Sequence, residues 1–226
     1  MTMRLAERAA FRPGQFMNLG LYVTGGEFVS RSYSLASAPG EQLEVLLARV
    51  GEGALTPALF DLREGSKVLV DPKPQGFFTF DYVPAHRELW LVATGTGLGP
   101  FLSMLRSGSA FERAERVILV HGVRGPAELA HRHELESLAG EQQGFRYVPV
   151  LSQKFEERLL QGRLTQALAS GQLEAAAATP LAAETAHVML CGNPAMIDEA
   201  IALLATRGLR RHRQRTPGHI TTEKYW

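Results

Sequence analysis

Three short segments of the sequence combine side chains and glycines in ways suited to ligand binding. The first places a cation, an aromatic ring and two hydroxyl groups side by side, as Arg31, Ser32, Tyr33 and Ser34. A flavin needs an aromatic face for stacking, a hydrogen-bond partner near its N5 atom and positive charge beside its phosphates. On a strand, Arg31 and Tyr33 would point to one face and Ser34 to the other. An ordinary half-buried strand is the alternative for these four residues taken alone.

The second segment is rich in glycine. It reads, in order, Gly95, Thr96, Gly97, Leu98, Gly99 and Pro100. It follows an apolar stretch and precedes a helical pattern, which is the context of a loop whose backbone N–H groups face a phosphate. The spacing matches neither the dinucleotide fingerprint G-x-G-x-x-G nor a P-loop. An ordinary glycine-rich turn is therefore the alternative.

The third segment ends the last apolar stretch, at Cys191, Gly192, Asn193 and Pro194. In an open α/β sheet, ligands bind beyond the carboxyl ends of the strands. Gly192 permits close approach of a ligand, and Pro194 can begin a helix. Cys191 has no His or Lys paired with it in the local sequence, so a small buried residue explains it better than a nucleophile.

Basic residues follow other strand ends, at Arg124, Lys154 and Arg163. An acidic residue closing the second strand of such a sheet favours the 2′-hydroxyl of NAD, and basic residues favour the 2′-phosphate of NADP. Here that strand ends at Arg124 without a carboxylate. Each arginine alone is explained by a solvated surface, but their shared position indicates phosphate binding.

Two regions with different patterns must position these segments. Up to about residue 84, short β-type stretches at 15–23, 31–36, 43–50, 67–70 and 77–80 predict a small antiparallel barrel. One helix is expected over Thr56–Leu62, with Thr56 as its N-cap and Pro57 as its first residue.

From about residue 85, apolar strands alternate with helices. The strands are expected at 88–93, 117–121, 145–151 and 187–190, and the helices at 98–105, 126–138, 164–169, 173–178 and 195–206. Unbroken apolar strands between helices predict a doubly wound parallel sheet with both faces covered. We therefore predict a β-barrel domain at 1–84 and an α/β domain at 85–226, with the boundary near Pro84.

The C-terminal end carries two further features. His219–Thr222 is expected to add a last strand to the sheet, and Tyr225 and Trp226 are unusually aromatic for a terminus, which indicates a tail held by packing or by a ligand. The preceding stretch holds Arg210, Arg211, Arg213 and Arg215. These four are either a solvated loop or a docking patch for an acidic partner.

Composition excludes several classes of protein. The chain has 226 residues, 45% hydrophobic and 21% charged, with net charge +1, which is typical of a globular protein and not of one that binds nucleic acid through bulk charge. One cysteine excludes an internal disulfide, a Cys-rich zinc site and a built-in iron–sulfur cluster, and it favours a reducing compartment. No stretch approaches the roughly 20 apolar residues of a membrane span. We expect no metal, no membrane insertion and no secretory signal.

Together and in this order, the segments resemble the ferredoxin–NADP reductase family, most closely its short bacterial type. The residues that carry the resemblance are 11–16, 31–34, 95–100, 188–194 and the Tyr225–Trp226 end. The family implies an N-terminal FAD-binding barrel and a C-terminal NADP-binding domain. It also implies an enzyme in which NADPH gives a hydride to flavin N5 and the reduced flavin gives single electrons to ferredoxin or flavodoxin.

The resemblance assigns roles residue by residue. The implied catalytic residues are Ser34 near flavin N5, Cys191 at the nicotinamide side and Glu223 on a proton route. FAD would be bound by Arg31, Ser32, Tyr33, Ser34, Ala54, Leu55, Thr56, Thr96, Tyr225 and Trp226, with Trp226 at the adenine end. NADP(H) would be bound by Gly95, Gly97, Arg124, Ser152, Arg163, Cys191, Gly192, Asn193 and Pro194.

The sequence departs from the family in two places. Gln153 stands where the family commonly has Arg, which weakens the expected 2′-phosphate site, although Lys154 can substitute as a point charge. The family also has a further strand and more before the position of Phe11, which residues 1–8 replace only in part. The barrel is therefore expected to lack its first strand and to expose an edge.

Two other functions remain open from the sequence. One is a flavoprotein reductase that serves an oxygenase, whose iron–sulfur acceptor must then lie on a separate chain. The other is a cofactor-binding electron-transfer subunit without turnover of its own. The expected form is a cytoplasmic monomer, and the sequence fixes neither the acceptor nor the direction of electron flow.

Overall fold

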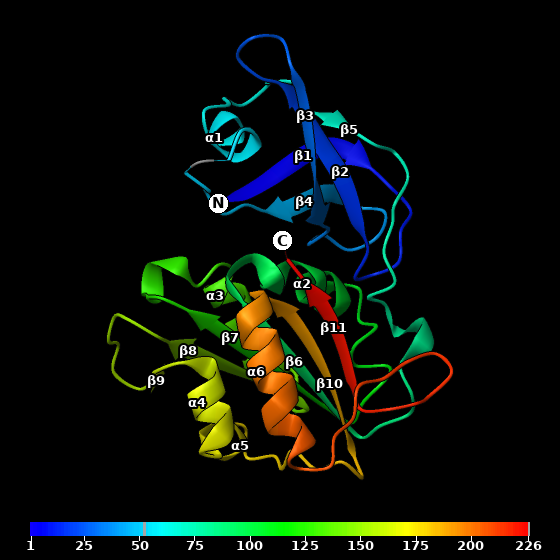
Figure 1. Cartoon of the computed structure of the whole chain (residues 1–226), viewed down its shortest axis with the longest axis vertical. Helices are drawn as coiled ribbons and strands as arrows, with labels where there is room; N and C mark the ends of the chain where they lie inside the picture. The colour runs from blue at the N-terminus through cyan, green and yellow to red at the C-terminus, as the bar shows by residue number, and fades with distance from the viewer. Residues whose placement is uncertain (52, 226) are drawn as a thin grey trace. The chain divides into compact units, whose positions relative to one another are not determined.

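The computed structural model describes residues 1–51 and 53–225 (Figure 1). The chain folds into two compact units, one formed by Met1–Thr79 with Gly99–Ser107 and the other by Phe80–Leu98 with Gly108–Trp226. The helix α2, Gly99–Arg106, is counted with the first unit although the chain on both sides of it belongs to the second. A single boundary near Pro84 stays a prediction.

Contacts within the first unit explain the placement of α2. The ring of Phe101 lies 5.7 Å from that of Phe78. At the end of the helix, Arg106 Nη1 donates to the carbonyl of Ala36 and to Glu44 Oε1, both at 2.8 Å. A buried carboxylate and a buried carbonyl are thereby satisfied by one guanidinium.

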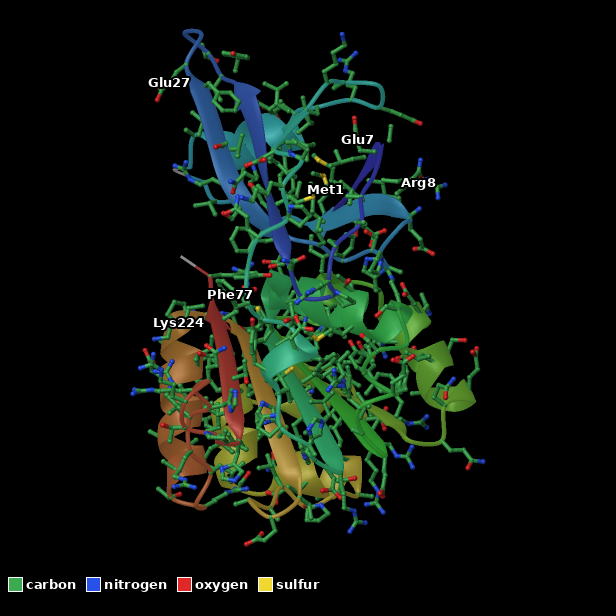
Figure 2. The ribbon with its side chains drawn as sticks, turned by 90° about the vertical axis from the view of Figure 1, so that its right-hand side faces the viewer. Met1, Glu7, Arg8, Glu27, Phe77 and Lys224 are labelled. Carbon is green, nitrogen blue, oxygen red and sulfur yellow. The ribbon has the colours of Figure 1, made fainter. Side chains whose placement is uncertain are left out.

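The first unit consists of two antiparallel sheets. In one, β1 (Thr2–Arg8) pairs with β4 (Gln42–Leu46), so residues 2–8 form a strand that the sequence pattern did not predict. In the other, β2 (Phe16–Tyr22) lies between β3 (Phe28–Ser34) and β5 (Leu69–Val70). A bridge between Leu35 and Val45 joins the sheets. Figure 2 shows Glu27 at the tip of the β2–β3 hairpin.

The sequence-based prediction is wrong at two places in this unit. The expected strand at 77–80 is absent, because Phe78 and Phe80 are buried without a strand partner and Phe80–Tyr82 forms a 3-10 turn, η1. The helix α1 spans Leu55–Phe60, and Thr56 is not its N-cap. Instead, Thr56 Oγ1 accepts from the Val50 N–H at 3.0 Å and donates to the Val50 carbonyl at 3.2 Å.

The second unit is built on a six-stranded parallel sheet with the order β11-β10-β6-β7-β8-β9. The strands are β6 Glu88–Thr94, β7 Arg116–Val123, β8 Phe145–Leu151, β9 Leu160–Gln161, β10 Ala186–Gly192 and β11 Ile220–Lys224. The tail adds a last strand to the sheet as predicted, and this strand, β11, pairs with β10. The two-residue β9 was not predicted, because two residues are too few to show a periodic pattern.

Helices α4 (Leu164–Ala169), α5 (Gln172–Ala177) and α6 (Pro194–Ala205) cover one face of this sheet, and Figure 1 shows α4 and α6 in front of it. Their apolar side chains form a core with strand residues that include Trp90, Ile118 and Val148. The predicted helix at 126–138 is divided into a 3-10 turn, η3 Pro126–Glu128, and α3, Arg132–Glu141, because His131 takes the left-handed φ of +57°. In the described part of the chain, no helix is long and apolar enough to cross a membrane.

Candidate functional site

The glycine loop, Gly95–Leu98, follows β6 as one 3-10 turn, η2. Gly95 has φ of +55°, in the left-handed region that favours glycine. At Gly97 the requirement is space, because a Cβ atom would collide with the carbonyl oxygen of Cys191 and lie 2.9 Å from Gly192 Cα. The loop is therefore packed directly on the end of β10.

The end of β10 also has no room for a side chain at Gly192. Gly192 has φ of +127°, and a Cβ atom there would collide with the hydroxyl of Thr94. That hydroxyl also accepts a hydrogen bond from the Asn193 N–H at 2.9 Å. Asn193 Oδ1 in turn accepts from the N–H groups of Ala195 and Met196, at 2.9 and 3.3 Å, so it is the N-cap of α6. The structure thus joins two segments that lie almost a hundred residues apart.

Cys191 is fully buried, and strand register places it beside Glu223 of β11. Burial is the main cause that raises the pKa of the Cys191 thiol well above its ordinary value. The charge of Glu223 raises the pKa further, and a hydrogen bond with the Tyr225 side chain lowers it. The thiol therefore stays protonated at neutral pH, and the structure supports a small packing residue here rather than a nucleophile.

The C-terminal tail is fixed at the same end of the sheet. The Tyr225 N–H donates to the Gly192 carbonyl at 3.0 Å, and Lys224 Nζ pairs with Asp198 at 2.7 and 2.8 Å. Figure 2 shows Lys224 at the end of β11. Trp226, which the resemblance places against FAD, lies outside the described residues.

The predicted 2′-phosphate residues gather where β7 and β8 end. The backbone N–H groups of Gln153 and Lys154 both donate to the Arg124 carbonyl, at 3.0 and 2.9 Å. The side chain of Lys154 lies over Gly125, where a Cβ atom would be 3.0 Å from Lys154 Cδ. Ser152 is tied to the same strand end, because its N–H and its hydroxyl both donate to the Val123 carbonyl. Two cations and a hydroxyl thus share one pair of loops.

Arg124 has a partner that the strand pattern did not reveal. Its Nε lies 3.0 Å from Glu128 Oε1 in an exposed ion pair, so a phosphate would compete with a carboxylate for this guanidinium. Arg163 precedes α4 and is exposed, and its backbone N–H donates to Gln166 Oε1 at 3.1 Å. The chain reaches Arg163 through Gly162, whose N–H donates to the Leu151 carbonyl at 2.9 Å at the end of β8.

An ion-pair network fixes the loop that carries Lys154, and sequence reasoning missed it. Arg132 of α3 meets Glu156 through both terminal nitrogens, at 2.7 and 3.0 Å, and its Nε lies 2.6 Å from Glu136. These hydrogen bonds raise the pKa of Arg132 and lower that of Glu156. The i,i+4 spacing of Arg132 and Glu136 was visible in the sequence, but the contact across 24 residues was not.

A second missed residue is His121, which lies fully buried on β7. Its Nε2 is 3.0 Å from the Gly95 carbonyl oxygen, so it contacts the glycine loop from inside the unit. Burial is the main cause that lowers the pKa of His121 to about 4. In the sequence it is one polar residue in an apolar strand, and that pattern gives no signal of the contact.

The predicted flavin residues of the first unit lie on β3 and α1. Arg31 is exposed, and its Nη1 donates to the Ser30 carbonyl at 2.7 Å. Tyr33 is half-buried, and this burial raises the pKa of its hydroxyl against the opposing charge of Arg31. Ser34 is buried on the other side of the strand, as the alternation predicts. The hydroxyl of Ser32 donates to Asn18 Oδ1 at 2.8 Å.

In the segment 54–56, backbone groups and not side chains are available for the predicted binding of FAD. Leu55 is buried in the core of the first unit, and the Thr56 hydroxyl is engaged with Val50. Ala54 is exposed and makes no side-chain capping bond to α1. Thr96 and Tyr225 belong to the second unit, whereas the other described residues predicted to bind FAD belong to the first.

Comparison with known proteins identifies the family. Residues 91–201 match the model of the oxidoreductase NAD-binding domain. Over 219 residues, the chain is 41% identical to the flavodoxin/ferredoxin–NADP reductase of Shigella flexneri, with 96% of this chain and 88% of that protein covered. The chain belongs to the ferredoxin–NADP reductase family. The ferredoxin–NADP reductase of Pseudomonas aeruginosa is 36% identical over 225 residues, with coverage of 95% and 86%.

A solved structure extends the match to the fold. The ferredoxin–NADP reductase of Neisseria gonorrhoeae, solved with bound FAD and NADP, matches with a TM-score of 0.91 and 32% identity over 99% of this chain and 90% of that one. The predicted family and fold class are thereby confirmed. In a reductase of this fold, the barrel is followed by a parallel α/β sheet, as in the two units described above.

Proposed function

We propose that this chain is an FAD-dependent reductase that passes electrons between NADPH and ferredoxin or flavodoxin. The observation that carries the proposal is the packing of the glycine loop on the end of β10, where Gly97 and Gly192 leave no room for a Cβ atom. Bare backbone at the carboxyl end of parallel strands suits a dinucleotide. The Shigella flexneri relative is named for both electron carriers, which supports this choice over an oxygenase partner.

The residues present fit NADP(H). Arg124, Lys154 and Arg163 supply positive charge for the 2′-phosphate, and Ser152 supplies a hydroxyl beside them. Gly95, Gly97 and the segment 191–194 would serve the pyrophosphate and nicotinamide side. Since Gln153 replaces a residue that is commonly Arg, Lys154 takes over part of the charge in this proposal.

The residues present also fit FAD. The exposed guanidinium of Arg31 suits its phosphates, and the half-buried ring of Tyr33 suits stacking on its isoalloxazine. When bound, FAD accepts hydride from NADPH and gives up electrons singly. Ser34 would provide the hydrogen-bond partner near N5, and Glu223 a proton route. The segment 54–56, Thr96, Tyr225 and Trp226 complete the proposed FAD set.

The proposed carrier is acidic, because the loop before β11 is basic. Arg210, Arg211, Arg213 and Arg215 are all exposed there. This loop lies at the amino end of the sheet, away from Cys191 and the glycine loop at the carboxyl end, so its charge would act by attracting the carrier to the protein and not by holding it at the nucleotide site. Reversing the charges of Arg211 and Arg213 should slow reduction of the carrier at low salt and leave reduction of a small dye unchanged. We further propose a cytoplasmic monomer.

The deciding experiment is a visible spectrum of the purified protein, repeated after NADPH and again after oxidised ferredoxin or flavodoxin. We expect flavin bands that bleach with NADPH and return with the carrier. If NADPH bleaches the flavin bands and neither carrier restores them, the chain would be a reductase for another acceptor, such as an oxygenase. A flavin that NADPH does not bleach, with no NADPH oxidation by an artificial acceptor, would make the chain a cofactor-binding subunit.

A further inference from the structure

His121 is a fully buried titratable group at the carboxyl end of the sheet. It has no exposed surface and is in register with Ala93 of β6 and Pro149 of β8, both uncharged. Its Nε2 meets the Gly95 carbonyl oxygen at 3.0 Å. Its Nδ1 is also buried and has no hydrogen-bond partner among the described residues.

The protonation of this ring follows from its partner. A carbonyl oxygen only accepts, so Nε2 must carry the proton and donate. The ring is neutral at pH 7, because burial lowers the pKa of His121 to about 4, although the hydrogen bond to Gly95 and the charge of Glu128 act in the opposite direction. Nδ1 is then a bare acceptor. One tautomer is therefore selected by the contact with the loop.

This contact orients a peptide group. In a trans peptide the C=O and the following N–H point in opposite directions. Because the Gly95 carbonyl points inward to His121, the N–H of Thr96 must point away from the imidazole. Gly95 has the left-handed φ of +55°, and glycine has no side chain to restrict its backbone. The orientation of the peptide plane after Gly95 therefore depends on a contact such as this hydrogen bond.

We propose that His121 is a positioning residue for NADPH, whose neutral imidazole holds the peptide between Gly95 and Thr96 in the orientation that binds the dinucleotide phosphates. The proposal rests on the proposed function and adds to it a residue that touches no substrate. A leucine at this position would fit an apolar strand and avoid the buried ring nitrogen, but it would leave the Gly95 carbonyl without the donor it has now. The strand instead keeps a ring with an unpartnered buried nitrogen, a cost that the donated hydrogen bond to the loop accounts for.

The test compares three substitutions. His121→Gln retains an N–H donor at about the reach of Nε2, whereas His121→Asn is too short to reach Gly95 and His121→Leu has no donor. Binding of NADP⁺ and of 2′-AMP is measured by titration calorimetry, since 2′-AMP requires only the Arg124 and Lys154 end. We expect the Asn and Leu variants to bind NADP⁺ roughly tenfold more weakly and 2′-AMP as well as wild type does, with Gln close to wild type for both. His133→Leu, at an exposed position on α3, is the matched control.

Nitrogen chemical shifts give a readout that does not depend on binding. The Nε2-protonated tautomer should be present and unchanged between pH 5.5 and 8. The opposite tautomer, or equal loss of NADP⁺ and 2′-AMP binding in the Leu variant, would overturn the proposal. So would wild-type NADP⁺ affinity in both the Leu and Asn variants. A wild-type protein that binds no NADP⁺ refutes the proposed function instead, and the tautomer measurement still tests the geometry of His121.

Discussion

The two ends of the parallel sheet are built in different ways. At the carboxyl end, backbone meets backbone, because Gly97 lies on Cys191 and Gly192 lies on Thr94. At the amino end, side chains meet in what we call the histidine cluster, formed by His86, His187, His212 and His219. The rings of His86 and His187 are 5.6 Å apart, and those of His187 and His212 are 6.0 Å apart.

Members of the histidine cluster bond to the last strand and to the loop before it. His187 Nε2 lies 2.9 Å from the hydroxyl of Thr221 on β11. The N–H groups of Gly218 and Arg210 donate to Nδ1 of His212 and of His219, at 3.2 and 3.0 Å. Such a nitrogen accepts only while it is unprotonated. The amino end should respond to protons through His187, whereas the carboxyl end should respond to added volume and, at His121, to protons as well.

The largest effect is expected from acid. Burial, the main cause, lowers the pKa of His121 to about 4 and that of His187 to about 3, and neighbouring histidines also lower the latter. In the unfolded chain, both histidines have pKa values near 6.5, so the unfolded state binds more protons than the folded state below that pH. Their contribution to stability is therefore fully present above pH 6.5 and is lost as the pH falls toward their folded-state pKa values. At pH 5, His121 and His187 should each have lowered the free energy of unfolding by roughly 2 kcal/mol relative to neutral pH, as measured by urea titration.

A single variant separates the two histidines. His187→Leu should remove about half of the part of this slope that His121 and His187 contribute between pH 7 and 5, whatever it does to stability at pH 7. An unchanged slope would show that the protonation of His187 is not linked to folding. The comparison between the ends of the sheet would then rest on packing alone.

A substitution that adds a side chain at the carboxyl end should produce the next largest effect. Gly97→Ala places a Cβ atom against the Cys191 carbonyl, so it should cost about 1–3 kcal/mol of stability and weaken NADP⁺ binding at least tenfold. Gly140→Ala in α3 is the control, because nothing lies within 4 Å of its Cβ position and the helix should gain about 0.5–1 kcal/mol. Wild-type NADP⁺ affinity in the Gly97 variant would remove the glycine loop from the site.

Cofactor choice provides a third test. Arg163→Ala should raise the Michaelis constant for NADPH roughly tenfold and leave that for NADH nearly unchanged, because only NADPH carries the 2′-phosphate. Arg116→Ala, at an exposed position where β7 begins, should change neither constant. Equal increases for both nucleotides would mean that Arg163 does not recognise the phosphate.

The smallest effect is expected at the tail. Deleting Tyr225 and Trp226 removes the hydrogen bond from the Tyr225 N–H to the Gly192 carbonyl and any stacking of these rings on FAD. Aromatic stacking contributes about 0.5–1.5 kcal/mol beyond buried area, so FAD should dissociate up to about tenfold more readily from a folded protein. FAD affinity and turnover equal to wild type would remove both residues from the site.

Sequence patterns predicted the scaffold well where apolar periodicity decides the structure. β8 and α4 have the predicted bounds, and the tail adds a last strand, β11, to the sheet as expected. Thr56 was misassigned because a Thr-Pro pair is typical of a helix start, whereas its hydroxyl bonds instead to the Val50 backbone of the preceding turn. Hydrogen bonds to a turn six residues earlier replaced the capping bond there.

The site was predicted in its backbone features and missed in its supporting side chains. Glycines at strand ends are visible from sequence because their spacing departs from any strand or helix pattern. The contacts of His121 with Gly95 and of Arg132 with Glu156 join residues 26 and 24 positions apart. A single sequence holds no signal for such pairs, because each partner is also typical of its own strand, helix or loop.

Cys191 can serve as a natural probe of local opening in the sheet. It is the only thiol in the sequence, it is fully buried, and β11 pairs along the strand that carries it. A thiol reagent can reach the sulfur only when that edge of the sheet opens. The rate of labelling in native conditions therefore reports the opening frequency of the last strand without any engineered probe, and adding NADP⁺ or lowering the pH would show directly how each changes it.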